Sequence, residues 1–299
     1  MGADLHRQLV NPITVKTIRG ADPDDRWMNA GILPYCGGYL MAVRRGWNCC
    51  HVYLMLFAKD WTPIGRPWHL DLTHPAALHA QEDPRLFLFR GKIHVSFSGV
   101  VQSHGMIEHV SMLYARLDDN LMVEAVYHVD DPAFMHWEKN HVFFECDGEL
   151  YGVYSVDPHR TYRLDGGRIV GKHMGGRAAG FVPGTPLRGS SPPVLHGGEY
   201  WSFFHSKYQP IGHKPRYCTG LYTFDAKPPF AVRRMTPLPF LEGDPKTNEP
   251  GSGLPDVLFT CGAIIEGEWA VLSSGEHDRA TVIHAVRLDE LDAALAPVT

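Results

Sequence analysis

Apolar and polar residues alternate along most of this chain in short runs of strand length, bounded by glycine, proline or polar clusters. In one clear example, the apolar run Leu86 to Phe89 is followed by an Arg90-Gly91 turn and then by the alternating run Lys92 to Ser98. Convincing helical spacing occurs only from Leu288 to Leu295. The pattern therefore predicts an all-β fold with one short helix near the end of the chain.

One unit occurs five times along the chain: a polar head, a strand, a glycine hairpin turn, a second strand and a polar tail. The turns lie near residues 38, 91, 148, 198 and 267, with further strands expected at 112–117 and 220–224. Such repeats of short strands are typical of propeller blades of about four strands. We therefore predict a single five-bladed β-propeller over residues 1–299, with blades at roughly 27–67, 68–118, 119–165, 166–226 and 227–290.

Two stretches interrupt the pattern and are expected to be long loops. Residues 171–184 hold five glycines, and residues 228–255 hold seven prolines. Both residue types oppose regular strands. Long loops in a compact domain often close over a functional site, although a plain connection between blades is equally compatible with these two.

Composition and charge limit the partners. The net charge of −5 and the pI near 6.4 give no general attraction to nucleic acid or acidic lipid. No apolar run approaches the roughly 20 residues of a membrane span, and the first ten residues lack the apolar core of a signal peptide. The six cysteines show no framework spacing. We expect a cytoplasmic protein with reduced thiols and no nucleic-acid or membrane partner, and an oligomer is compatible with the sequence.

Metal and cofactor sites have little support in the sequence. The chain contains 18 histidines but no HExxH motif and no paired Cys/His spacing. The glycine-rich run 175–180 lacks the strand-turn-helix context of a dinucleotide site, and no GxSxG motif is present. We expect neither a metal nor a cofactor.

The predicted architecture brings the polar heads and tails together, because the innermost strands of all blades line one channel and their equivalent ends converge. The residues that this convergence places in one pocket are Asn29, Arg44, Asp83, Arg85, Lys139, Asn140, His205 and Asp278. Carboxylates, cations and amides in one pocket suit a ligand with many hydroxyl groups. Aromatic residues that could stack on sugar rings are Tyr35, Trp137, Tyr154, Trp201 and Tyr208, although core packing is the commoner role for such residues. Asp83 and Arg85 alone are equally compatible with a structural ion pair.

Several motifs appear in one order along the chain: Glu82-Asp83-Pro84-Arg85, Glu138-Lys139-Asn140, Ser191-Pro192-Pro193 with His205, Phe259-Thr260-Cys261-Gly262-Ala263, and Gly275-Glu276-His277-Asp278. This succession resembles glycoside hydrolase family 130 over roughly residues 27–290, and the stretch 222–241 also looks like that family. The resemblance implies a five-bladed propeller and an inverting β-mannoside phosphorylase or β-1,2-mannosidase. The related β-1,2-mannosyltransferase/phosphorylases share the fold, so a transferase is a further implied activity.

The resemblance also implies roles at matching positions. Asp83 matches the general acid, which protonates the glycosidic oxygen, in phosphorylases through a substrate hydroxyl. The expected substrate-binding residues are Asn29, Arg44, Arg85, Glu138, Lys139, Asn140 and Asp278, of which Asn29, Arg44 and Asp278 match positions that hold the reacting sugar. Lys139, Asn140 and His205 match the region that receives phosphate, and Arg188 is a further candidate, from its charge, for binding phosphate or a leaving group.

The sequence departs from the phosphorylase pattern at two positions. Val194 or Leu195 replaces a lysine expected after the paired prolines, and Ser155 replaces an arginine expected after the second strand of the third blade. We therefore expect that inorganic phosphate is not the preferred acceptor.

Three reaction types remain open. Inverting hydrolysis needs a second carboxylate as base, for which Glu138, Glu276 and Asp278 are available. Phosphorolysis needs one acid and an oriented phosphate. A transferase would use a nucleotide sugar or sugar phosphate, with Lys139, Arg188 and Lys207 as cations for the leaving group. A non-catalytic sugar-binding propeller is the alternative from another functional class.

Overall fold

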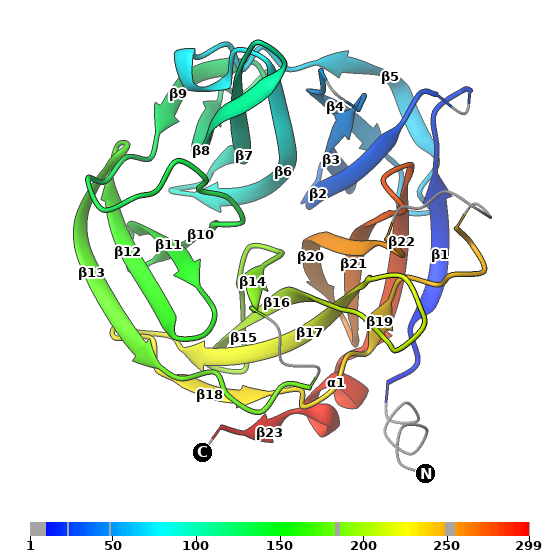
Figure 1. The fold of residues 1–299 in the computed structure, drawn as a ribbon, viewed down its shortest axis with the longest axis vertical. Coiled ribbons are helices and arrows are strands. Elements are labelled where there is room, and N and C mark those ends of the chain that lie inside the picture. Colours follow the sequence, from blue (N-terminus) through cyan, green and yellow to red (C-terminus); the bar gives the residue numbers. More distant parts are fainter. Residues whose placement is uncertain (1–9, 23, 48, 183–185, 249–254, 299) are drawn as a thin grey trace.

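The computed structural model describes residues 10–22, 24–47, 49–182, 186–248 and 255–298. Most of these residues form strands, and the strands form five antiparallel sheets that follow one another around a common centre (Figure 1). The fold is therefore all-β and propeller-like, as the alternating pattern predicts. The stretch 1–9, which holds most of the region examined for a signal peptide, lies outside the described residues.

Three sheets are simple meanders, in which each strand pairs with the next one along the chain. The first contains β2 (Trp27–Tyr35), β3 (Gly38–Arg45), β4 (His51–Phe57) and β5 (Pro63–His69). The second contains β6 (Ala80–Phe89), β7 (Lys92–Ser103), β8 (Met106–Leu117) and β9 (Val123–His128), and the short 3₁₀ helix η1 (Pro75–Ala77) precedes it. The third contains β10 (Val142–Cys146), β11 (Glu149–Ser155), β12 (His159–Asp165) and β13 (Arg168–Gly176).

The other two sheets include strands from distant parts of the chain. The fourth contains β14 (Arg188–Gly189), β15 (Val194–His196), β16 (Glu199–Tyr208), β17 (Arg216–Asp225), β18 (Val232–Met235), β19 (Leu241–Glu242) and β23 (Ala296–Pro297). The fifth contains β20 (Leu258–Glu266), β21 (Trp269–Glu276), β22 (Ala280–Arg287) and β1 (Ile13–Ile18).

The ring is closed by strands from both ends of the described chain. Strand β1 pairs antiparallel with β22, so the fifth sheet combines one N-terminal strand with three C-terminal strands. This pairing satisfies the backbone groups of β22 that would otherwise form an open sheet edge. The alternating pattern of the sequence does not reveal it, because the partner of β1 lies more than 250 residues further along the chain.

The repeated hairpins are confirmed. A hairpin joins β2 to β3, β6 to β7, β10 to β11, β15 to β16, and β20 to β21, each at one of the predicted glycine turns. The additional strand candidates lie within β8 and β17, and the helix expected near the end is α1 (Leu288–Ala294). This short helix is far below membrane-spanning length, and the described part of the chain contains no helix with the length and apolar character for that purpose.

The prediction of two long loops was wrong in part. Residues up to Gly176 of the first stretch belong to β13, which pairs with β12, and the second stretch contains β18 and β19. Gly175 marks a close approach of two chain segments, because a Cβ atom there would collide with the carbonyl oxygen of Phe230. A glycine within a strand often has this role.

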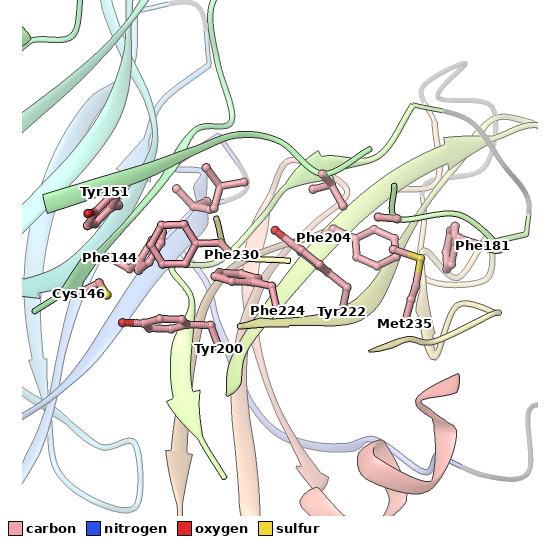
Figure 2. Close-up of a cluster of buried hydrophobic side chains, with 14 of the residues drawn as sticks. Phe144, Cys146, Tyr151, Phe181, Tyr200, Phe204, Tyr222, Phe224, Phe230 and Met235 are labelled. Atoms are coloured by element: carbon pink, nitrogen blue, oxygen red, sulfur yellow. The ribbon is translucent and has the colours of Figure 1, made fainter. Parts of the chain in front are cut away.

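Apolar side chains fill the space between neighbouring sheets. Figure 2 shows one such cluster, in which Phe144 of the third sheet packs against Tyr200 and Phe224 of the fourth and against Phe230. The ring centroid of Phe144 lies 4.7 Å from that of Tyr200 and 5.6 Å from that of Phe224. Burial of each large aromatic side chain contributes about 1.5–3 kcal/mol, so these contacts hold adjacent sheets in a fixed relation.

Candidate active site

A cavity of about 490 Å³ is lined by residues in or beside strands of all five sheets. Its polar lining residues are Asn29, Arg44, Glu82, Asp83, Lys139, Asn140, Arg188, His205, Lys207, Tyr217 and Asp278. Apolar contributions come from Pro186, Pro255, Val257 and Phe259. The ring thus brings together groups that are far apart in the sequence.

Three polar heads share a backbone conformation that is rare for residues other than glycine. The φ angles of Asn29, Asp83 and Asn140 are 53°, 53° and 67°. The register of strand pairing shifts between Met28 and Gly31 and again between Glu82 and Arg85, which marks a β-bulge at each place. A left-handed conformation at such a residue costs about 1–3 kcal/mol, and contacts around it must offset that cost.

The side chain of Asp83 is the most firmly held carboxylate in the cavity. Its Oδ1 accepts a 2.7 Å hydrogen bond from Nδ2 of Asn29 and lies 3.4 Å from Nη1 of Arg44. Gly275 leaves room for this arrangement, because a Cβ atom there would collide with the carboxamide oxygen of Asn29. Asn29, Arg44 and Asp83 therefore form one buried unit across the first two sheets.

Arg44 and Glu82 extend this unit toward the third sheet. Nη2 of Arg44 lies 3.2 Å from one carboxylate oxygen of Glu82, and Nζ of Lys139 lies 4.0 Å from the other. The side chains of Arg44 and Glu82 are only 11% and 21% exposed, so water screens their attraction less than it would at the surface. The ion pairs orient Glu82 and Lys139 along the cavity lining.

Arg85 does not line the cavity and is completely buried. Its guanidinium donates hydrogen bonds to the carbonyl oxygen of Ser190 at 2.5 Å, to the carbonyl oxygen of Asp83 at 3.0 Å and to Oδ1 of Asn140 at 3.2 Å. These acceptors belong to the heads of three different sheets. One buried side chain therefore fixes the relative positions of three segments that line the cavity.

The cavity contains two carboxyl groups with opposite pKa shifts. Burial raises the pKa of Asp83, but the charges of Arg44, Arg85 and Lys139 and the hydrogen bond from Asn29 outweigh burial and lower it overall. Burial also raises the pKa of Asp278, where Arg44 offsets only part of the effect and the charges of Asp83 and Glu82 raise it further. In the free site the charged form of Asp83 is therefore stabilised, and Asp278 binds a proton more readily than an ordinary aspartate does.

His205 is a neutral member of the site. Burial, together with the charges of Arg85 and Arg188, lowers its pKa to about 3. Its Nδ1 lies 2.9 Å from the hydroxyl oxygen of Ser190, and its ring packs edge-on against Phe259 at 4.5 Å between centroids. Its imidazole can therefore exchange hydrogen bonds with a ligand without adding charge.

The lining divides into two sides by charge. The first, second and fifth sheets supply Glu82, Asp83 and Asp278, with Asn29 and Arg44 among them, and we call these residues the carboxylate side. The segment before β10 and the strands β14 and β16 supply Lys139, Arg188 and Lys207, which we call the cationic side. The Nζ atom of Lys207 lies 5.5 Å from the ring centroid of Tyr217. The cavity can thus hold a hydroxyl-rich group on one side and an anionic group on the other.

The structure brings most of the expected site residues to this cavity. Asn29, Arg44, Asp83, Lys139, Asn140, Arg188, His205 and Asp278 line it. Arg85 and Glu138 are the exceptions. Arg85 is completely buried and binds the segments that carry lining residues, and the carboxylate of Glu138 points into the third sheet, where it accepts from the amide of Met135 at 2.8 Å and lies 3.3 Å from Nε2 of His141.

This geometry leaves fewer candidates for the second carboxylate, which an inverting hydrolase would use as its base. Glu138 is engaged elsewhere, and Glu276 is not among the cavity-lining residues; its carboxylate accepts from the hydroxyl of Thr247 at 3.3 Å. Asp278 lines the cavity from the turn between β21 and β22, where its backbone has a φ angle of 54°. Asp278 and Glu82 are thus the carboxylates beside Asp83 in the described lining.

Some lining residues were not identified as site residues from the sequence. Glu82 opens the motif Glu82-Asp83-Pro84-Arg85, but it was not among the residues expected to bind the ligand. Tyr217 lies directly opposite Lys207 in the β16–β17 pairing, and Phe259 lies at the start of the fifth repeat. The pairing register could have identified Tyr217, since the residue opposite a cavity-lining position often shares its face of the sheet.

The two positions where the sequence departs from the phosphorylase pattern do not line the cavity. Val194 and Leu195 lie in β15, where the side chain of Leu195 is 57% exposed, and the hydroxyl of Ser155 donates to the carbonyl oxygen of Pro158 at 2.6 Å. Arg188 and Lys207 contribute cations from other positions. The expectation about phosphate stays a prediction, although these cations weaken its basis.

No metal cluster is evident in the described part of the chain, in which no group of three or more His, Cys, Asp or Glu side chains is arranged to hold an ion. All six cysteines are free thiols.

Comparison with known proteins places this fold beside mannoside-active enzymes. No protein-family model and no curated protein sequence matches the chain. Among solved structures, a β-1,2-mannobiose phosphorylase from Listeria innocua in complex with β-1,2-mannobiose matches with a TM-score of 0.68 and 16% identity, over 93% of this chain and 99% of that one.

Two further structures represent the related activities. One comes from work on the GH130 family of mannoside phosphorylases, which contains glycoside hydrolases that target β-1,2-mannosidic linkages in Candida mannan. This structure matches with a TM-score of 0.67 and 11% identity, over 91% of this chain and 94% of that one. The other is MPT-1, a GDP-Man-dependent mannosyltransferase from Leishmania mexicana, with a TM-score of 0.61 at 16% identity, covering 93% and 90%. Identities this low establish a shared fold, and at that level the resemblance to family 130 and to the mannosyltransferases is confirmed.

Proposed function

We propose that this protein is an inverting carbohydrate-active enzyme that acts on β-mannosides, with β-1,2 linkages favoured. One observation carries the proposal: a buried, oriented carboxylate at Asp83 shares a cavity with a separate group of cations on a mannoside-enzyme fold. Carboxylates and amides bind sugar hydroxyls, and cations receive phosphate or a phosphorylated leaving group. The cavity volume of about 490 Å³ falls in the usual range for small-ligand sites.

We also propose that each of the five sheets is one blade of a five-bladed propeller within a single domain. The blades then follow the sheets, at 27–69, 80–128, 142–176, 188–242 and 258–287, with β1 completing the last. Three boundaries differ from those expected from the sequence. The second moves from 118 to 128 because β9 pairs with β8, the third from 165 to 176 because β13 pairs with β12, and the fourth from 226 to 242 because β18 and β19 pair with β17. A cytoplasmic location is proposed from the six free thiols.

Asp83 is the proposed general acid. During inversion the bond between the anomeric carbon and the glycosidic oxygen breaks, the nucleophile bonds to the opposite face, and the leaving oxygen takes a proton. Because neighbouring cations lower the pKa of Asp83 in the free site, the carboxyl must gain its proton as the complex forms. An anion bound by Lys139 would offset one of those cations and raise the pKa of Asp83 toward that of a proton donor.

Asp278 is the proposed second carboxyl group. It lines the cavity, and burial together with the charges of Asp83 and Glu82 raises its pKa, which suits a group that accepts or shares a proton during the reaction. In a hydrolase it would have to ionise and activate water, with about 6.5–9.5 Å between the two carboxyl groups.

A transferase is the second candidate, and the cationic side supports it. Lys139, Arg188 and Lys207 come from two adjacent sheets and could stabilise the negative charge of a departing phosphate or diphosphate. Inorganic phosphate, a sugar phosphate and a nucleotide sugar are thus the proposed second reactants. A non-catalytic sugar-binding protein is less well supported, because simple binding does not need a strained, buried carboxylate.

Product analysis tests the proposal. The protein is incubated with β-1,2-mannobiose alone, with β-1,2-mannobiose and phosphate, and with GDP-mannose and mannose, and products are followed by NMR. Mannose alone identifies a hydrolase, mannose 1-phosphate a phosphorylase, and a new disaccharide from GDP-mannose a transferase. An α-configured first product from mannobiose supports inversion. Absence of both turnover and sugar binding would contradict the proposed function.

A further inference from the structure

Trp137 is an exposed aromatic side chain beside the candidate active site. Its relative exposure is 55%, and that of Met135 is 75%. Both residues lie in the segment that leads from β9 inward to β10 (Figure 1). Large apolar side chains exposed at a cavity mouth often mark a binding surface.

The segment that carries Trp137 is fixed against β8. Trp137 forms a parallel bridge with Val110, the amide of Val110 donates to the carbonyl of His136 at 2.8 Å, and the amide of Glu138 donates to the carbonyl of Val110 at 2.8 Å. The backbone is therefore extended and held on both sides of Trp137. The backbone position from which the indole ring extends is therefore defined before any ligand binds.

The alternation of an extended chain gives the direction of the Trp137 side chain. The carboxylate of Glu138 points into the third sheet, where it binds His141. Successive side chains in an extended segment leave on opposite faces, so Trp137 and Lys139 share the face opposite Glu138. Lys139 lines the cavity. Trp137 therefore continues the cavity lining outward, two residues or about 6–7 Å along the chain.

Other aromatic candidates for sugar stacking are engaged elsewhere. Trp201 is only 3% exposed, Tyr154 stacks on Phe134 with 5.5 Å between centroids, and the hydroxyl of Tyr208 donates to Glu242 at 3.0 Å. Tyr35 lies at the hairpin end of β2, away from Asn29. Within the set expected from the sequence, Trp137 combines an exposed ring with a position next to the cavity.

We propose that Trp137 is a stacking platform for the sugar unit that lies one step outside the reacting disaccharide, so that the protein prefers β-mannosides of three or more units. The inference rests on the proposed function and extends it to chain length. A pyranose ring presents a face of C–H groups that packs on an aromatic ring, while its hydroxyls remain in water. Segment 135–138 supplies such a ring two residues from the cavity-lining Lys139.

Calorimetric binding to uncleavable ligands tests this inference separately from catalysis. Sulfur-linked analogues of β-1,2-mannobiose and β-1,2-mannotriose are titrated into the full-length protein and into Trp137→Ala, Trp137→Phe and Met174→Ala variants. Met174 is the control, because it is 61% exposed in strand β13 and does not line the cavity. We expect the wild-type protein to bind the trisaccharide about tenfold more tightly than the disaccharide, from one aromatic stacking contact.

Each outcome has a defined meaning. Loss of the trisaccharide preference in Trp137→Ala, with disaccharide affinity changed less than about threefold and the preference retained in Trp137→Phe and Met174→Ala, supports the platform. An unchanged preference in Trp137→Ala, or an equal loss for both sugars, overturns the platform and leaves the proposed function intact. If the wild-type protein binds neither sugar, the proposed function itself fails and the inference with it.

Discussion

On the carboxylate side of the cavity, buried groups hold one another in place, whereas on the cationic side the charged groups are more open to solvent. Asp83 is fixed by Asn29 and Arg44, and its backbone adopts a left-handed conformation. Arg188 and Lys207 are exposed, each in a strand of the fourth sheet. Both sides line the same cavity, but the surrounding fold depends more on the carboxylate side than on the cationic side.

This difference separates two requirements of a group-transfer site. A carboxyl group that exchanges a proton with one particular atom must be positioned before the ligand arrives, and burial provides that rigidity. Cations that receive a diffusible anion act over a longer range and tolerate exposure. We therefore expect substitutions on the carboxylate side to abolish chemistry or stability, and those on the cationic side to change the affinity for one reactant.

The largest effect is expected for Asp83→Asn. Asparagine keeps the size of the side chain but cannot deliver a proton, so turnover should fall by about 10²–10⁴ while sugar binding is retained. Turnover, sugar affinity and melting temperature should be measured on the same preparation. If the variant melts early but keeps wild-type turnover per folded molecule, Asp83 is a structural residue and its assignment as acid is wrong.

The next largest effect is expected for substitution of the buried Arg85. Arg85→Met should lower the free energy of unfolding by about 3 kcal/mol or more, because the carbonyls of Ser190 and Asp83 and the amide oxygen of Asn140 lose their donor. Urea denaturation gives the value. Arg188→Met is the matched control and should change stability by less than about 0.5 kcal/mol, since Arg188 is exposed. Equal losses in both variants would show that the buried contacts of Arg85, which hold Asp83 and Asn140, do not matter more for stability than the exposed Arg188 on the cationic side.

Arg188→Gln tests whether the cationic side binds the anionic reactant. Loss of one charge-assisted contact should weaken binding of the anionic reactant about tenfold, with mannobiose affinity changed less than about threefold. Calorimetry with phosphate and with GDP-mannose measures the first quantity and shows which anion the protein prefers. Tighter binding of phosphate than of GDP-mannose would also contradict the sequence-based expectation about phosphate. A similar loss for sugar and anion would show that Arg188 does not act on the anion specifically.

A further effect is a pH dependence of stability from His205. Its folded pKa of about 3 lies below the ordinary value of 6.5, so between these values the unfolded chain binds a proton that the folded protein does not. Stability should therefore fall as pH falls from about 6.5, by up to about 1.4 kcal/mol per pH unit. The lowered pKa of Asp83 acts only below its ordinary value of 3.8 and does not overlap with measurements at pH 7, 6 and 5.

Urea denaturation at those three pH values should show a shallower slope for His205→Asn than for the wild-type protein. Other buried histidines, such as His284 with a pKa lowered to about 4, contribute equally to both proteins and cancel in this comparison. Identical slopes would mean that His205 is not held neutral in the folded protein.

The sequence by itself determined the strands of the five glycine hairpins, the further strands at 112–117 and 220–224 and the short helix, because these depend on local periodicity and turn chemistry. It also identified most of the cavity, since the polar heads recur at equivalent places in each repeat. Asn29, Asp83 and Asn140 were recognisable as members of one set before their shared left-handed backbone was known.

Only the tertiary structure decided what depends on contacts between distant segments. Glu138 belongs to the same motif as Lys139, yet it turns into the third sheet because His141 and the amide of Met135 bind it there. Strand β1 is recognisable only through its pairing with β22, and Gly175 of β13 marks a close approach to Phe230 instead of a loop. Alternation along a strand shows which residues share a face, but the side that faces the cavity is set by bulges and by the neighbouring sheet.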